Sequence, residues 1–327
     1  MNSILVQTHA NIALIKYWGK RNEKLFLPTK SSISVTISHL KTTTHITFNS
    51  ENKDHILYNW HNSTKKTIEK ITQFLDLFRK KYSIDTHFTI TTNNEFPTGA
   101  GLASSSSGFA ALAIGLDALC ALNLTKKEIS ILARQGSGSA CRSVYGGFVQ
   151  WHKGNRGDGS DSYAEQLFPA NHWPELRVIL AVVSAQEKLV SSRIGMQQTV
   201  ATSTSYKQWL AESEQRIPQM IQALENKNFS LVGNLTEADW YGMRQSMLTT
   251  IPQLDYCLTT THDVIHVIQN LRKNNIEAYF TTDAGPNVKI LCLDKDLRKI
   301  CTHLKNIPGV IQVIECAATG DPVAITQ

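Results

Sequence analysis

Hydrophobic and polar residues alternate along two short stretches near the start of the chain, residues 32–37 and 43–48. A period of two is typical of strands with one buried face, and the short connection between the stretches predicts a β-hairpin. Apolar residues then recur at helical spacing over residues 68–78, and residues 87–91 alternate again. A Gly- and Ser-rich turn leads into a predicted helix of small residues over 104–122. These patterns predict that the first part of the chain is rich in strands.

Helical patterns dominate the second part of the chain. Thr125 and Glu128 have the spacing of a capping box, so a helix is predicted to begin there. The apolar run 178–183 is predicted to be a buried strand, and Pro218 is expected to kink or break the helix that contains it. Beyond residue 183 we expect helices over 206–225, 229–247, 262–274 and 295–304, and strands over 278–282, 288–293 and 310–316.

Strands and helices are mixed without the regular alternation of a doubly wound sheet, which indicates an α+β fold class. A chain of 327 residues is too long for one minimal domain and suits one large or two medium ones. Because the balance of predicted elements changes after the strand at 178–183, we place a domain boundary near residue 185. The expected domains are residues 1–185 and 186–327.

Composition narrows the classes of function. The net charge of +6 is not concentrated in long runs, which suits anionic small molecules, and no zinc spacing or recognition helix indicates nucleic acid. The first residues lack the order of a signal peptide, and no apolar run approaches the roughly 18 residues of a membrane helix. The six cysteines lack CxxC spacing, as expected of reduced thiols. We therefore expect a cytoplasmic protein with no membrane or nucleic-acid partner.

Residues 97–108, PTGAGLASSSSG, connect a predicted strand to a predicted helix. Gly99 and Gly101 permit close approach to the backbone, and the amino terminus of a helix offers free N–H groups and a positive dipole end to a triphosphate. Ser104 or Ser105 could add a hydroxyl to a phosphate oxygen or to magnesium. The segment is not a Walker A loop, because no Gly-Lys-Ser/Thr closes it. Composition alone leaves a flexible turn with a serine N-cap as an equal alternative.

Three further segments carry candidate chemistry. Lys16 and Lys20 follow an apolar strand, and Asp283 precedes a Gly-Pro turn. Small residues and hydroxyls at 136–139 precede Arg142, whose guanidinium can grip a carboxylate with two hydrogen bonds. Taken alone, each segment has a simpler interpretation: solvated lysines at a strand end, an aspartate that caps a turn, and an exposed arginine in a glycine-rich connection.

The order Pro-x-x-x-Gly-Leu-x-Ser-Ser in the glycine-rich segment resembles the phosphate loop of the galactokinase, homoserine kinase, mevalonate kinase and phosphomevalonate kinase superfamily. One branch, diphosphomevalonate decarboxylase, is similar over longer segments, namely residues 11–20, 136–148, 171–178, 192–196 and 283–287. These segments keep the family's order and spacing from residue 8 or so to the end. The resemblance implies a two-domain small-molecule-kinase fold, with a ribosomal-protein-S5-like amino-terminal domain, a ferredoxin-like carboxy-terminal domain and the active site in the cleft between them.

The resemblance also implies roles for individual residues. Asp283 would orient and deprotonate the substrate's 3-hydroxyl, Lys16 would lie beside it, and Arg142 would hold the substrate's carboxylate. The implied substrate-binding residues are Ala13, Tyr17, Lys20, Ser137, Gly138, Ser139, Arg142, Ser192 and Arg193. The implied ATP-binding residues are Pro97, Gly99, Ala100, Gly101, Leu102, Ala103, Ser104, Ser105 and Ser106. No fixed metal site is expected, and magnesium would arrive with ATP through Ser104 or Ser105.

The implied reaction is the ATP-dependent decarboxylation of mevalonate 5-diphosphate to isopentenyl diphosphate, CO2, ADP and phosphate, a step of isoprenoid biosynthesis in the mevalonate pathway. The implied assembly is a homodimer. A kinase or decarboxylase that uses mevalonate or its monophosphate stays an alternative, as does a non-catalytic ligand-sensing module on the same scaffold. The chain departs from the family pattern at Lys30, where relatives usually carry Asn, at Gly99 and at residues 244–246. The first and the last of these departures lie near segments expected to meet nucleotide or substrate, so they leave the preferred substrate open.

Overall fold

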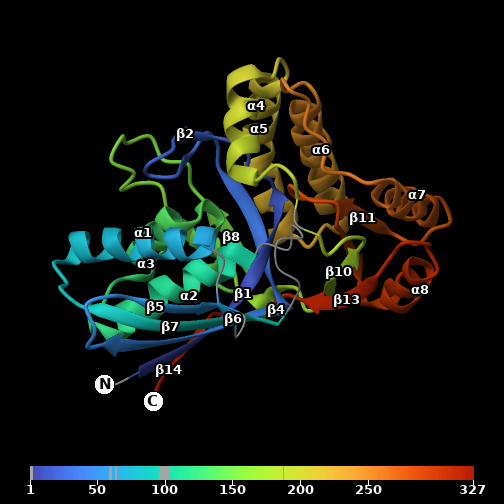
Figure 1. Cartoon of the computed structure of the whole chain (residues 1–327). Coiled ribbons are helices and arrows are strands. Elements are labelled where there is room, and N and C mark those ends of the chain that lie inside the picture. The colour runs from blue at the N-terminus through green and yellow to red at the C-terminus, as the bar shows by residue number, and fades with distance from the viewer. Residues whose placement is uncertain (1–2, 59–60, 63–64, 96–103, 187) are drawn as a thin grey trace.

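The computed structural model describes the whole chain except residues 1–2, 59–60, 63–64, 96–103 and 187. Two larger sheets, each with helices packed against it, form its framework (Figure 1). The predicted α+β class is confirmed. Within the described residues, no helix has the length and apolar character needed to cross a membrane.

Eight strands form the first sheet: β1 (Ser3–Ile15), β4 (Ser32–Asn49), β5 (His55–Tyr58), β6 (His61–Asn62), β7 (His87–Asn94), β8 (Phe148–Trp151), β9 (Ala164–Phe168) and β14 (Val323–Thr326). Their order is β14-β1-β4-β7-β5-β6, with β8 beside β4 and β9 beside β8. Three helices pack on this sheet, α1 (Lys65–Tyr82), α2 (Ser104–Leu119) and α3 (Lys126–Gly136) (Figure 1). Their side chains, such as Phe74, Phe109 and Leu116, share one core with Ile46 and Phe88 of the strands.

The predicted hairpin over residues 32–48 is wrong, because β4 runs through this region as one strand. Its first part pairs with residues 11–15 of β1 and its second part with residues 3–9, and the register shifts between them. The irregularity lies at His39, whose φ is 64°. The sequence there, Ser-His-Leu-Lys, lacks the Gly, Asn or Asp that a tight hairpin turn favours. The two alternating stretches are therefore one strand with a bulge.

Four antiparallel strands form the second sheet, β10 (Leu176–Val182), β11 (Ala278–Thr281), β12 (Val288–Leu293) and β13 (Gln312–Ala317), in the order β11-β12-β10-β13. The accompanying helices are α4 (Ser192–Thr202), α5 (Tyr206–Glu225), α6 (Phe229–Leu248), α7 (Thr259–Lys273) and α8 (Asp294–Lys305). Shorter elements are the β2–β3 ribbon (Lys20–Asn22 and Leu27–Pro28) and the 3-10 helices η1 (Gly138–Val144) and η2 (Ala170–His172).

Most elements predicted for the second part of the chain are confirmed. The helix over 206–225 and the strand over 288–293 match α5 and β12 residue for residue. Pro218, expected to kink or break its helix, lies inside α5 without ending it, so the break is wrong and the kink stays a prediction. The capping box at Thr125 is confirmed, because its side chain accepts from the Glu128 N–H and the Glu128 carboxylate accepts in return. Sequence patterns missed α4 and the short strands β8, β9 and β14.

The two sheets are joined through a shared core and through the end of the chain. Residues near the end of β1 and the start of β4, such as Ile12 and Val35, pack against Val178 of β10 and against Met220 of α5. Beyond β13 the chain returns to the first sheet, where β14 pairs with β1. The domain boundary near residue 185 stays a prediction.

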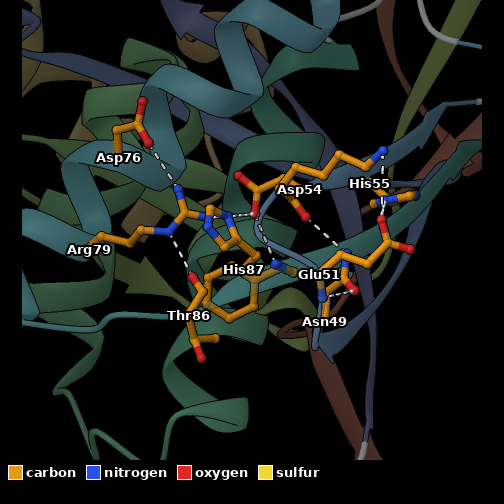
Figure 2. A network of polar contacts seen from close by, with 10 residues as sticks. Asn49, Glu51, Asp54, His55, Asp76, Arg79, Thr86 and His87 are labelled. Atoms are coloured by element: carbon orange, nitrogen blue, oxygen red, sulfur yellow. Dashed lines mark hydrogen bonds and ion pairs between the residues drawn. The ribbon is translucent and has the colours of Figure 1, made fainter.

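A network of ion pairs holds the end of α1 to the first sheet (Figure 2). Arg79 of α1 pairs with Asp54 in the loop between β4 and β5, and it donates to Asp76 at 2.9 Å and to the carbonyl of Thr86 at 2.7 Å. Asp54 also accepts from the backbone N–H of Phe88 at 2.9 Å. In this network the guanidinium of Arg79 is paired with carboxylates of the protein itself.

Candidate active site

A cavity of about 500 Å³ is lined by residues that belong to both sheets and their helices. That volume lies within the usual range for small-molecule sites, roughly 300–1,000 Å³. One side is formed by the end of β1, the start of α2 and the junction of α3 with η1, and the other by residues 188–196, Met243 and Asp283. The predicted site residues that line it are Ala13, Lys16, Tyr17, Lys20, Ser104, Ser105, Ser137, Gly138, Ser139, Arg142, Ser192, Arg193 and Asp283.

Asp283 follows the carboxy-terminal end of β11 and forms ion pairs with two lysines. The Nζ of Lys16 is 2.9 Å from its Oδ1, and the Nζ of Lys289 is 3.2 Å from its Oδ2. Desolvation opposes ionisation of Asp283, but the two ion pairs outweigh it and hold the pKa of Asp283 well below its usual range. Burial lowers the pKa of Lys16, and Asp283 works against this shift. The cavity therefore contains an ionised carboxylate whose two oxygens are held in place.

Arg142 is a buried cation that faces the cavity and is held by neutral groups. Its Nε donates to Asn11 Oδ1 at 3.0 Å and its Nη1 to Ser32 Oγ at 2.7 Å, and its guanidinium lies 6.0 Å from the ring centre of Trp151. Only 3% of the residue is exposed, and no carboxylate among the described residues forms an ion pair with it. A buried charge without a partner is costly, so the site favours an anionic ligand beside Arg142.

Tyr17, Lys20 and Arg193 form a second polar group on the cavity wall. Lys20 pairs with Glu23 at 2.6 Å, and both Lys20 and Arg193 lie over the ring of Phe26, at 5.0 and 4.8 Å from its centre. The buried hydroxyl of Tyr17 has no hydrogen-bond partner among the described residues, and burial raises its pKa. It leaves a donor available for a ligand at this end of the cavity.

Gly138 lies next to this tyrosine. A Cβ built on Gly138 would be 2.6 Å from the Tyr17 hydroxyl oxygen, closer than carbon and oxygen atoms can approach. A larger residue would therefore displace Tyr17 from the cavity wall. Gly138 is therefore needed here for close packing against a polar side chain.

The glycine-rich segment can be compared with its prediction only in part. Its residues Pro97, Gly99, Ala100, Gly101, Leu102 and Ala103 lie outside the described residues. Ser104 and Ser105 begin α2 and line the cavity, and the Ser105 hydroxyl lies 3.2 Å from that of Ser137. Ser106 is fully buried and its hydroxyl lies 3.5 Å from that of Ser143. The first two serines thus face the cavity, whereas Ser106 packs behind it.

Several residues of the site were missed by sequence reasoning. Lys188 lines the cavity and donates to Ser192 Oγ at 2.6 Å and to the carbonyl of Ala284 at 2.8 Å. Burial lowers the pKa of Lys188 to about 8. Lys289 was detectable in retrospect as a cation in the apolar strand β12, and Asn11 is part of the amino-terminal segment similar to the family. Lys188 follows no comparable pattern.

The side chains that line the cavity indicate how a metal ion could bind there. Within the described part of the chain, no group of three or more His, Cys, Asp or Glu residues is arranged to hold a metal ion. Hydroxyls at Ser104 and Ser105 and the carboxylate of Asp283 do offer oxygen ligands, the type that magnesium prefers. Magnesium bound together with a nucleotide fits this donor set.

Known proteins resemble the chain over most of its length. Two family models match it, a diphosphomevalonate decarboxylase-like N-terminal domain over residues 8–164 and a mevalonate 5-diphosphate decarboxylase C-terminal domain over residues 178–325. A diphosphomevalonate decarboxylase of Candida albicans is 38% identical over 327 aligned positions, which cover 94% of this chain and 90% of the relative.

Solved structures agree with these matches. Mevalonate diphosphate decarboxylase from Staphylococcus aureus superposes with a TM-score of 0.94 at 36% identity, covering 99% of this chain and 98% of that one. A structure of MDDEF in complex with MVAPP, AMPPCP and magnesium superposes with a TM-score of 0.93 at 38% identity, covering 100% and 99%. The similarity extends over both sheets and therefore over both walls of the cavity.

Proposed function

The chain belongs to the diphosphomevalonate decarboxylase family, and we propose that it carries out the ATP-dependent decarboxylation of mevalonate diphosphate in the cavity between its two sheets. The observation that carries this assignment is the pairing of Lys16 with Asp283 in the same cavity as the buried Arg142, which has no carboxylate partner among the described residues. A base held by cations and a carboxylate receptor are the two groups that the reaction requires.

Asp283 acts on the 3-hydroxyl of the substrate. Its ionised carboxylate accepts the hydroxyl's hydrogen bond and aligns the oxygen for attack on the γ-phosphorus of ATP. The low pKa of Asp283 makes it a weak base, so the proton moves to its carboxylate as the new O–P bond forms and ADP leaves. Lys16 and Lys289 hold the carboxylate in position throughout.

Arg142 acts on the decarboxylation step. Once the 3-oxygen carries a phosphate it becomes a good leaving group, and its departure leaves positive charge at C3. The bond between the carboxylate and C2 then breaks, and its electron pair forms the double bond as CO2 departs. Arg142 keeps the carboxylate aligned with the breaking bond, and Lys16 together with Arg142 stabilises the phosphate as it leaves.

The remaining cavity residues bind the two phosphate chains. The hydroxyl of Tyr17 and the cations Lys20 and Arg193 lie together and suit the substrate's diphosphate. Ser192, Ser139, Ser137, Gly138 and Ala13 complete that wall. The amino terminus of α2, with Ser104 and Ser105, also lines the cavity and suits the triphosphate of ATP, to which the cation Lys188 of the same lining adds positive charge. Magnesium held there with ATP would supply charge neutralisation of the phosphates.

The assembly and location of the protein are inferred from the edge of the first sheet and from the cysteines. The outermost strand β14 leaves Val323 and Ile325 exposed at the free edge of the first sheet, a feature that supports a homodimer. A cytoplasmic location agrees with six free cysteines. Light scattering after size-exclusion chromatography measures the assembly, and a monomeric mass at micromolar concentration would contradict the dimer.

One experiment separates the proposed reaction from its alternatives. The purified protein is incubated with ATP, magnesium and, in separate reactions, mevalonate, its monophosphate or its diphosphate, and ADP, phosphate and CO2 are measured. Equal amounts of all three products with the diphosphate are expected. ADP without CO2 would identify a kinase, CO2 mainly from the monophosphate would change the substrate, and no product from any of the three would favour a non-catalytic module.

A further inference from the structure

A second lysine lies behind the catalytic pair and does not line the cavity. Lys30 is 1% exposed, and its Nζ donates to the carbonyl of Lys16 at 2.6 Å and to that of Ser31 at 2.9 Å. The ammonium group also lies 5.2 Å from the ring centre of Trp209. Lys30 is thus a buried cation whose hydrogen bonds go to the backbone of the segment that carries the active site.

The backbone N–H of Lys16 is also held by a side chain. Lys16 is the first residue after β1, and its backbone N–H donates to Asp239 Oδ2 of α6 at 2.6 Å. Asp239 is fully buried and accepts a hydrogen bond from Ser213 of α5 as well. The N–H and the carbonyl of Lys16, which a strand partner would bind inside a sheet, are therefore bound by Asp239 and Lys30.

A third contact holds Trp18, two residues after Lys16. The hydroxyl of Tyr206 donates to the carbonyl of Trp18 at 2.8 Å. Tyr206 and Asp239 lie on α5 and α6, and they contact the end of a strand from the other sheet. The backbone that carries Lys16 and Tyr17 into the cavity is fixed from several directions.

Burying a lysine is costly unless its charge is compensated. Desolvation lowers the pKa of Lys30 to about 8, opposed by the nearby carboxylates of Asp239 and Glu214. Packing alone could be provided by an apolar side chain of similar length, without that cost. The feature that an apolar side chain lacks is a donor for the Lys16 carbonyl.

We propose that Lys30 is a positioning residue for the phosphorylation and decarboxylation of mevalonate diphosphate, because its hydrogen bond to the Lys16 carbonyl fixes the backbone from which Lys16 reaches Asp283. This inference rests on the proposed function. Lys30 and Asp239 together set the direction of the Lys16 side chain, and the carbonyl bound by Lys30 also belongs to the peptide that leads into Tyr17. Small displacements of catalytic groups cost up to about 100-fold in rate.

The test compares Lys30→Met, which keeps the length of the side chain and removes its donor, with the parent enzyme. We expect kcat to fall by about 10- to 100-fold while the KM for mevalonate diphosphate changes little, since Lys30 does not touch the cavity. Lys41→Met serves as the control, because Lys41 is a half-exposed lysine of β4 that is paired with Glu95 and does not line the cavity. Its kcat should equal that of the parent.

The pH profile of kcat gives a readout that a purely structural role would not move. The charged groups that face Asp283 are Lys16, Lys289, Lys188 and Arg142. If Lys16 loses its fixed backbone, its ion pair with Asp283 weakens, the pKa of Asp283 rises toward its ordinary value, and the acidic limb of the profile moves to higher pH. Loss of stability alone lowers the amount of active enzyme without moving that limb.

Two results would overturn the inference. One is a folded Lys30→Met enzyme with the parent's kcat, and the other is a reduced kcat with an unmoved acidic limb. If Lys30→Met does not fold, Lys30→Leu, which also removes the donor, is measured in the same way and held to the same outcomes. If the parent protein has no decarboxylase activity, the proposed function itself is contradicted. If the parent is active and the Lys30 variants have the same kcat as the parent, only the inference about Lys30 is contradicted.

Discussion

Two clusters of charged residues in this protein differ in how their cations are compensated. Around Arg79, shown in Figure 2, the guanidinium pairs with Asp54 and Asp76, so the network is closed within the protein. In the cavity, the hydrogen bonds of Arg142 within the described part of the chain go to the neutral groups of Asn11 and Ser32, although Arg142 is more deeply buried. The difference teaches that a buried cation that lines a cavity and has no carboxylate partner among the described residues marks a site for an anionic ligand, whereas a closed ion-pair network marks a structural contact.

The strongest way to disturb the cavity is to remove its carboxylate charge. We expect Asp283→Asn to lower turnover by about 10²- to 10⁴-fold, because the amide can orient the hydroxyl but cannot accept its proton. ADP and CO2 formation are measured at saturating substrates with a variant whose melting temperature matches the parent. Both products should disappear together.

Two other outcomes change the role of Asp283. Continued ADP formation without CO2 assigns it to the elimination step. A turnover reduced by less than tenfold leaves Asp283 as a turn cap and contradicts the mechanism.

Substitutions of Arg142 test whether its guanidinium binds the substrate's carboxylate. Arg142→Gln removes charge-assisted hydrogen bonds of about 1.5–3 kcal/mol, so we expect CO2 release to fall by roughly 10- to 150-fold while ATP binding persists. Arg142→Lys keeps the charge without the planar fork and should rescue only in part. Nucleotide affinity is followed by calorimetry and CO2 by direct assay. Parent-like CO2 release in both variants would place the carboxylate elsewhere.

Substitutions of the serines at the start of α2 test the proposed ATP-binding part of the cavity. Removing both hydroxyls in the double variant Ser104→Ala/Ser105→Ala should raise the KM for ATP by about tenfold, since each hydroxyl contributes at most one hydrogen bond to a phosphate. The KM for mevalonate diphosphate serves as the internal control and should not change. An unchanged KM for ATP in a folded double variant would show that these hydroxyls do not contact the nucleotide.

The Arg79 network should respond in the opposite way. Arg79→Met leaves the buried carboxylate of Asp54 without its cation and is expected to lower the free energy of unfolding by about 1–3 kcal/mol, with no change in turnover. Urea denaturation and steady-state kinetics measure the two effects. Asp76→Asn, which breaks only the exposed pair with Arg79, is the matched control and should cost less than about 1 kcal/mol. A loss of turnover in folded Arg79→Met enzyme would contradict the distinction between the two clusters.

Local patterns were sufficient for most helices and for the candidate chemistry. The capping box at Thr125 and the apolar periodicity of α5 depend on residues a few positions apart, and both were predicted at the right place. The predicted hairpin in β4 failed because its two halves are held by a distant strand, β1, which the local alternation does not contain. The strand β14 was missed for the same reason, since its four exposed residues form a strand only by pairing with β1.

The sequence by itself determined which residue types this protein has for its chemistry, namely Lys16, Arg142 and Asp283 in motifs similar to one family. Only the tertiary structure decided how they are arranged. Lys16 and Asp283 are 267 positions apart, and their contact exists because α6 and the second sheet pack against the end of β1. Two further contacts join segments that no local pattern links. They are the ion pair of Asp283 with Lys289 and the hydrogen bond from Lys30 to the Lys16 carbonyl. Burial, which sets the pKa of these groups and the need of Arg142 for an anion, is a property of the packed molecule, so no single stretch of sequence contains it.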